Sequence, residues 1–101
     1  MTDLRFEWDE AKNWENIGKH GISFEDAEGV FADQNAVWLL DPDDSGDEER
    51  FLTIGYCLKA RLLVVCNCHR ENDTIIRIIS ARKADKREEE EYGRGNYEGP
   101  L

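Results

Sequence analysis

Apolar and polar positions alternate at the start of the chain, which predicts a short strand over residues 4–8. Leu4, Phe6 and Trp8 fall on one side of that strand, so one of its faces should meet a core. A helix is expected next, because the Asp9 carboxylate can accept hydrogen bonds from the first free amides of a helix. Gly21 stands where a left-handed residue would end that helix.

Two helices are expected between residues 9 and 33, each with one apolar face. In the first, Ala11, Trp14 and Ile17 recur three residues apart, and this stripe is expected to face the core. We expect the tryptophans Trp8 and Trp14 to be core residues. The second helix begins at Ser23, where an acidic residue three positions later completes a capping-box pattern. Its apolar positions are Phe24, Ala27, Val30 and Phe31.

The second half of the chain contains apolar, β-branched segments that predict four strands, over residues 36–40, 51–58, 61–69 and 74–81. The short turns between the last three suit antiparallel hairpins. Residues 83–95 are highly charged and predict a short final helix. We therefore expect an α+β domain in the order β-α-α-β-β-β-β-α, with an antiparallel sheet and its helices on one face. This domain should cover residues 1–92, with a flexible tail at 93–101.

The distribution of charge changes what the composition implies. The formal net charge is −10, which on its own disfavours a nucleic-acid partner. Residues 1–49 carry three basic and fifteen acidic side chains, whereas residues 50–87 carry nine basic and three acidic ones. A local basic surface is therefore possible in the second half of the chain.

The cysteines and the start of the chain indicate the cellular compartment. Cys57, Cys66 and Cys68 are an odd number, which argues against a complete disulfide framework and favours reduced thiols. The N-terminus lacks the basic start and apolar stretch of a signal peptide. The longest apolar run, residues 62–66, is too short to span a bilayer. We expect a cytoplasmic protein with no membrane partner.

Two segments imitate metal sites but lack the required ligands. Residues 41–46 resemble the start of a calcium-binding loop, but its twelfth position is Leu52 rather than a bidentate glutamate. Cys66, Cys68 and His69 have no second ligand pair at zinc-finger spacing, and an ideal strand turns His69 away from both thiols. We expect no metal and no other cofactor.

Two blocks of sequence together resemble the BrnT family of bacterial toxins. The first lies within residues 6–27 and contains KHGISF at 19–24, and the second is RIISARKA at 77–84. Agreement also extends to residues 49–50, 55, 62–65 and 92, so the match spans nearly the whole chain.

The resemblance implies a small RelE-like domain that acts as the ribonuclease toxin of a type II toxin–antitoxin system. Such a toxin would cleave RNA without a metal ion and so inhibit translation and growth. It would be neutralised by a BrnA-like antitoxin with a ribbon-helix-helix DNA-binding region, and the complex would bind operator DNA through that antitoxin.

Metal-independent cleavage of RNA needs a base for the ribose 2′-OH, cations against the phosphorane charge and an acid for the 5′-oxygen. Arginine suits the cationic task, because its planar fork can bind two phosphate oxygens. We expect Arg50, Arg77 and Arg82 in this role, with Arg82 preferred because it lies where the last strand ends. On an ideal strand Arg77 and Arg82 point to opposite faces, so at least one of them should be structural. A surface charge or an ion pair is the alternative for each.

Lys19 and His20 end the first predicted helix and are candidates for proton transfer. The alternative is that both cations complement the negative end of the helix dipole. His69, at a strand end, is expected at the surface.

The final segment supplies candidates for RNA binding. Lys83, Lys86 and Arg87 form a basic cluster suited to phosphate contacts. Residues 88–91 are all glutamate, so the alternative is ion pairs of Lys86 with residue 90 and of Arg87 with residue 91. Tyr92 is a candidate acid or stacking surface for a base.

A competing interpretation is a non-catalytic toxin homologue that binds its antitoxin and acts in transcriptional control. The net charge of −10 favours this alternative, because it weakens long-range attraction to RNA.

Overall fold

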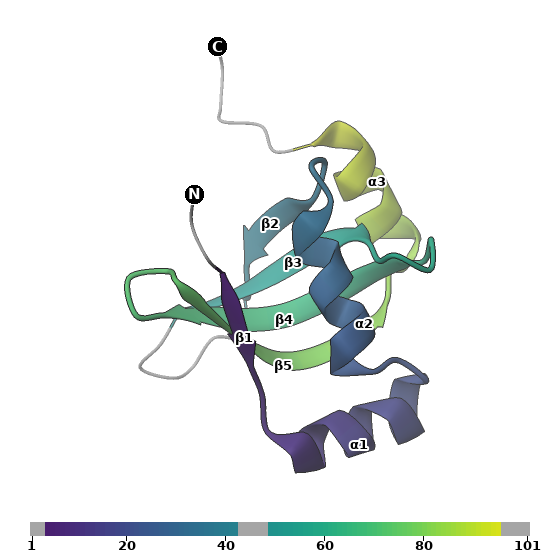
Figure 1. The fold of residues 1–101 in the computed structure, drawn as a ribbon. Coiled ribbons are helices and arrows are strands. Elements are labelled where there is room, and N and C mark those ends of the chain that lie inside the picture. Colours follow the sequence, from purple (N-terminus) through teal and green to yellow (C-terminus); the bar gives the residue numbers. More distant parts are fainter. Residues whose placement is uncertain (1–3, 43–48, 96–101) are drawn as a thin grey trace.

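The computed structural model describes residues 4–42 and 49–95, in which helices cover both faces of one five-stranded sheet (Figure 1). The elements follow the predicted order. They are β1 (Arg5–Glu7), α1 (Glu10–His20), α2 (Phe24–Glu28), the 3₁₀ helix η1 (Gly29–Ala32), β2 (Val37–Leu40), β3 (Arg50–Tyr56), β4 (Leu62–Arg70), β5 (Ile75–Lys83) and α3 (Lys86–Arg94). Most of the calcium-like segment and residues 96–101 lie outside the described ranges, so a flexible tail stays a prediction.

The sheet is mixed rather than purely antiparallel. Its strand order is β1-β5-β4-β3-β2, and β2 to β5 pair antiparallel as expected. The first strand departs from the prediction, because Arg5, Phe6 and Glu7 pair in parallel with Ile75, Ile76 and Arg77 of β5. These two strands are separated by most of the chain. No tight hairpin therefore fixes their relative direction.

The predicted helix ends are confirmed. The Asp9 carboxylate accepts hydrogen bonds from the backbone N–H groups of Ala11 (2.8 Å) and Lys12 (3.3 Å) at the start of α1. Gly21 ends that helix with φ +71°, a left-handed conformation that costs glycine little. The Ser23 hydroxyl accepts the Asp26 N–H at 3.0 Å at the start of α2. These local signals set where the chain turns toward the sheet.

The main core lies between α2, η1 and one face of the sheet, and α2 crosses in front of the strands in Figure 1. Phe24, Ala27 and Val30 are fully buried there, as predicted. Gly55 allows η1 to approach β3, because a Cβ at this position would lie 3.0 Å from Val30 Cγ1. The sheet contributes Cys57, Leu63, Val65, Ile76, Ile78 and Ala81.

Helix α1 turns a polar face inward, contrary to the predicted apolar stripe. Trp14 is 67% exposed, so its expected place in the core is wrong, whereas Trp8 does pack against the core. The buried side chains of α1 are Asn13 and Asn16. Asn16 Nδ2 donates to the carbonyls of Ile22 and Ala81 (2.8 Å each), and its Oδ1 accepts the Ala81 N–H at 3.1 Å. β1 pairs only with residues 75–77 of β5. At Ala81, further along the same edge of β5, the Asn16 side-chain amide takes the hydrogen bonds that a neighbouring strand would make.

Helix α3 lies over the other face of the sheet, so the expectation that all helices share one face is wrong. Tyr92 and Ala84 pack against a second buried cluster formed by Val37, Ile54 and Val64. Alternate residues of β3 and β4 are apolar on this face as well, and that surface needs a cover. Among the helices of the described ranges, none has the length and apolar character of a membrane span.

The Asn16 amide should be a major source of stability. Asn16→Ala would leave the buried N–H and C=O of Ala81 without these partners, and we expect it to lower the free energy of unfolding by about 2–4 kcal/mol. Trp14→Ala on the exposed side of α1 is the control and should cost less than about 1 kcal/mol. Urea unfolding followed by circular dichroism measures both. Equal losses for the two variants would contradict this role of Asn16.

Candidate functional site

Strand β5 contains a β-bulge between its two predicted site arginines. Asn67 of β4 pairs with Ile78, but the preceding residue Cys66 pairs with Ser80, which leaves Ile79 as an extra residue. Such an insertion reverses the facing of every later side chain relative to a regular strand. The bulge therefore changes which side of the sheet the end of β5 presents.

Because of this bulge, Arg77 and Arg82 lie on the same face of the sheet. Arg77 pairs with Cys68 and Arg82 with Val64, and these two β4 residues are an even number of positions apart. The expectation that the two arginines point to opposite faces is wrong, since it assumed an unbroken alternation.

A third predicted arginine shares this face. Arg50 of β3 also pairs with Cys68, so Arg50, Cys68 and Arg77 form one row across three strands. Arg82 lies further along the sheet, roughly 13 Å away along the strand direction. We call this surface, opposite to α2 and carrying Arg50, Arg77 and Arg82, the arginine face. Arg77 and Arg82 side chains are 33% and 41% exposed, so ligands can reach them.

Arg82 makes a two-pronged ion pair with helix α3. Its Nη1 donates to Glu88 Oε1 at 2.8 Å and its Nη2 to Glu88 Oε2 at 2.7 Å. These hydrogen bonds hold the pKa of the Glu88 carboxyl below its ordinary value and raise the pKa of the Arg82 guanidinium. The backbone N–H of Asp85 also donates to Glu88, in a capping box that starts α3. The start of α3 thus fixes Arg82.

Arg77 is held more loosely. Its Nη1 donates to Glu7 Oε2 on β1 at 3.1 Å, and Nη1 of Arg70 lies 3.7 Å from the same oxygen. One carboxylate therefore faces two guanidinium groups at this corner of the sheet.

Lys19 and His20 lie at the edge of the same sheet. They line a cleft of about 220 Å³ between α1 and β5. Ser80 also lines this cleft and pairs with Cys66, which places it between the two arginine positions of β5. Both residues lie in the last turn of α1, where a positive charge would complement the helix dipole, so this alternative stays a prediction.

The predicted basic cluster at the end of the chain is divided by the fold. Lys83 pairs with the buried Leu63 and so lies on the α2 side of the sheet, whereas Lys86 and Arg87 are exposed at the start of α3. In the described ranges, neither expected ion pair of Lys86 or Arg87 forms. The acidic run instead pairs Glu88 with Arg82, and Glu91 with Arg94.

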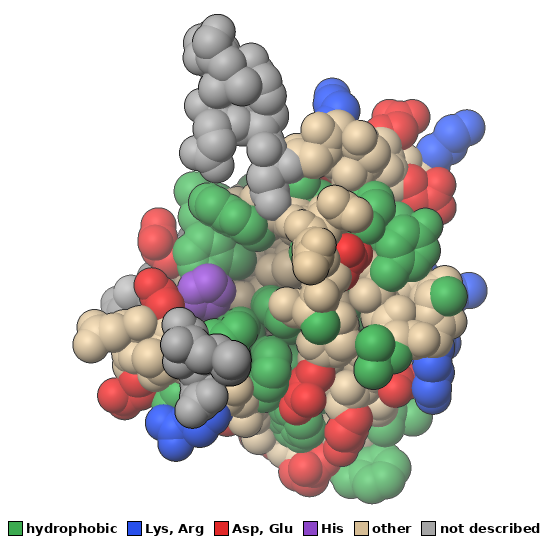
Figure 2. Space-filling model, turned by 45° about the horizontal axis from the view of Figure 1, so that its top comes forward, with side chains coloured by type: hydrophobic (Ala, Val, Ile, Leu, Met, Phe, Trp, Pro, Cys, Tyr) green, Lys and Arg blue, Asp and Glu red, His purple; other side chains and the backbone are tan. Residues whose placement is uncertain are grey.

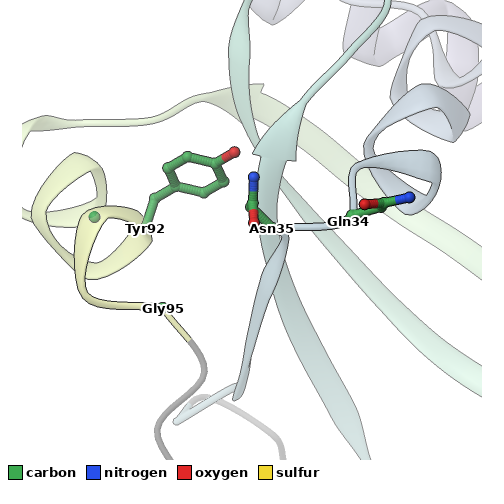
Figure 3. A pocket seen from close by; sticks show the side chains of 5 residues that line it. Gln34, Asn35, Tyr92 and Gly95 are labelled. Atoms are coloured by element: carbon green, nitrogen blue, oxygen red, sulfur yellow. The ribbon is translucent and has the colours of Figure 1, made fainter.

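Tyr92 ties α3 to the sheet. Its hydroxyl donates to Asp33 Oδ2 at 2.8 Å, and this oxygen also accepts the backbone N–H of Tyr56 at 2.9 Å. The bond to Asp33 raises the pKa of the Tyr92 phenol. Figure 3 shows the ring reaching toward Asn35, while Gln34 points away. This arrangement favours an anchoring role over the predicted one as an acid.

The cysteines are all free, and all three are buried. Cys66 lies on the arginine face, and its thiol is 3.5 Å from Asp41 Oδ2. Burial, together with the Asp41 charge, raises the pKa of this thiol to about 11, so it is neutral at physiological pH. His69 stacks on Phe51 with ring centroids 4.7 Å apart, on the other face as predicted. Within the described ranges, no three His, Cys, Asp or Glu side chains are grouped to hold a metal.

Comparisons with known proteins place this geometry in a family. A family model described as the ribonuclease toxin BrnT of type II toxin–antitoxin systems matches residues 8–88. The chain is also similar to the crystal structure of the Brucella abortus ribonuclease toxin BrnT, with 26% identity and a TM-score of 0.60. That match covers 82% of this chain and 99% of the Brucella chain. A search of curated proteins found no match. A RelE-like relationship stays a prediction.

The environment of Cys66 leads to a chemical prediction. With its pKa near 11, the native thiol should react with iodoacetamide at pH 8 about 100-fold more slowly than in unfolded protein, because little thiolate is present. Asp41→Asn removes a nearby negative charge and should speed the reaction. Peptide mass spectrometry separates Cys66 from Cys68. Equal labelling of native and unfolded protein would show that the thiol is accessible and ionised.

Proposed function

Because this chain belongs to the BrnT family of ribonuclease toxins of type II toxin–antitoxin systems, we propose that it cleaves RNA on the arginine face without a metal ion. The observation that carries this proposal is the bulge at Ile79, which brings Arg77 and Arg82 onto the face that holds Arg50. Three forked cations on one partly open sheet surface suit a chain of phosphates.

In the proposed reaction the ribose 2′-oxygen attacks the adjacent phosphorus while the bond to the 5′-oxygen breaks. The products are a 2′,3′-cyclic phosphate and a 5′-hydroxyl, and the proton lost by the 2′-OH is balanced by one gained at the 5′-oxygen. We assign stabilisation of the phosphorane charge to Arg82 and binding of neighbouring phosphates to Arg50 and Arg77. Lys19 and His20, at the edge beside Ser80, remain the candidates for proton transfer.

The acidity of the chain does not oppose RNA at this surface. Strands β3 to β5 come from the basic half of the sequence, whereas α1, α2 and β2 come from the half that carries fifteen carboxylates. In Figure 2, which keeps the α2 side partly toward the reader, Lys and Arg side chains lie mainly at the rim of the visible surface. The arginine face also carries carboxylates, and Glu7 and Glu88 pair with Arg77 and Arg82 there.

The family also implies an antitoxin partner. We propose that this partner is a BrnA-like antitoxin with a ribbon-helix-helix region, and that operator DNA is bound through the antitoxin alone. The acidic α2 side would suit a partner with a basic surface. We also infer that the protein acts in the cytoplasm, where reduced cysteines such as its three buried ones are the norm.

Arg82→Lys tests the proposed reaction, since it keeps the charge but removes the fork. We expect about 10- to 100-fold slower RNA cleavage by purified protein in EDTA, because a charge-assisted contact of this kind is worth about 1.5–3 kcal/mol. The control is Arg61→Lys. The Arg61 side chain pairs with Asp26 of α2, away from the proposed site, so this variant should cleave RNA like the wild type.

Cleavage is followed on gels, and circular dichroism verifies folding. An equal loss in both variants would remove the assignment of Arg82. If folded wild-type protein binds its antitoxin but cleaves no RNA, the proposed ribonuclease activity is wrong and the non-catalytic homologue is favoured.

A further inference from the structure

We propose that Glu88 is a positioning residue for Arg82, holding the guanidinium so that one of its edges stays open to two oxygens of an RNA phosphate. This inference rests on the proposed function, which supplies the RNA, but the role of Glu88 was not expected from the sequence. In this proposal, Glu88 of the acidic run in α3 has a role in RNA binding.

The hydrogen bonds of Arg82 show which edge is occupied. A guanidinium has five N–H groups. Nη1 donates to Glu88 Oε1 and to the Lys83 carbonyl (3.2 Å), and Nη2 donates to Glu88 Oε2. Within the described ranges, the Nε–H and the second N–H of Nη2 make no hydrogen bond. These two groups lie parallel on one edge of the plane, the geometry that matches two phosphate oxygens.

Glu88 is itself fixed, so it can fix its partner. Its side chain is only 16% exposed, and its Oε1 also accepts the Asp85 N–H at 2.8 Å. The Asp85 carboxylate in turn accepts the Glu88 N–H at 2.9 Å. At the other end of α3, Tyr92 is bound to Asp33. A long, flexible arginine held in this way loses less conformational freedom when a phosphate binds.

The same geometry argues against a role in which Glu88 blocks Arg82. A blocking carboxylate would have to occupy the N–H groups that the phosphate needs. Glu88 accepts one N–H from each of Nη1 and Nη2 and leaves the edge formed by Nε and Nη2 unoccupied. The Arg82 side chain is also 41% exposed, so part of it is open to solvent beside α3.

The test compares Glu88→Gln with Glu91→Gln in the full chain. Both changes remove one negative charge from α3, but Glu91 pairs with Arg94 and not with Arg82. Glutamine also suits the capping-box position, so both variants should fold. We expect Glu88→Gln to lower kcat for RNA cleavage about 10-fold with a smaller change in KM, and Glu91→Gln to stay within about twofold of the wild type.

A second measurement does not depend on cleavage. The Nε–H signal of Arg82 in ¹⁵N NMR spectra is followed while a 2′-O-methyl RNA oligonucleotide, which lacks the attacking hydroxyl, is added. We expect this signal to shift in the wild type and in Glu91→Gln, and to shift several-fold less at equal RNA concentration in Glu88→Gln.

The outcomes separate the two proposals. Faster cleavage by Glu88→Gln than by Glu91→Gln would show that Glu88 blocks Arg82, and identical behaviour of the two variants would reduce Glu88 to a structural residue. Either result overturns the positioning role. If the wild type cleaves no RNA but its Arg82 signal still shifts and that of Glu88→Gln does not, the positioning role stands and the proposed cleavage fails.

Discussion

The outer edge of strand β5 is the constraint on which the rest of this structure depends. β4 satisfies one edge of β5, but the other edge faces outward and its backbone groups also need partners. β1 pairs with residues 75–77, and the Asn16 amide then bonds both backbone groups of Ala81. Between these two partners lies the extra residue Ile79. The N-terminal strand and helix are therefore placed by what β5 requires.

This arrangement links the architecture to the candidate chemistry. The bulge turns Arg82 onto the face of Arg77, and the strand end places Arg82 beside the first turn of α3. Glu88 completes the site by fixing the guanidinium. Because the basic half of the chain builds this face, a protein with a net charge of −10 still presents cations together. Location, rather than total charge, decides what the surface can bind.

Local signals predicted much of the fold. The caps at Asp9, Gly21 and Ser23 act within a few residues, so they are visible in the sequence and are confirmed. The parallel pairing of β1 was missed, because it depends on a partner about seventy positions away. Trp14 was placed in the core because an apolar stripe normally faces inward. In this helix the buried side chains are instead two asparagines, which form hydrogen bonds with residues distant in the sequence, and Trp14 is exposed.

The arginines were chosen from the sequence as candidates, and their role stays a prediction. Their arrangement was predicted wrongly, because a regular strand puts Arg77 and Arg82 on opposite faces and nothing in the sequence marks the bulge at Ile79. The acidic run at residues 88–91 was expected to pair with Lys86 and Arg87, so the place of Glu88 beside Arg82 was not predicted. The capping-box pattern that starts at Asp85 was the available signal for its special place.

The central claim is that RNA phosphates bind the arginine face, and a crystal structure with a 2′-O-methyl RNA oligonucleotide tests it most directly. The account predicts phosphate oxygens within hydrogen-bond distance of the Arg82 Nε–H edge, with neighbouring phosphates at Arg50 or Arg77. RNA bound instead on the α2 side, or along Lys83 with Arg82 untouched, would contradict it.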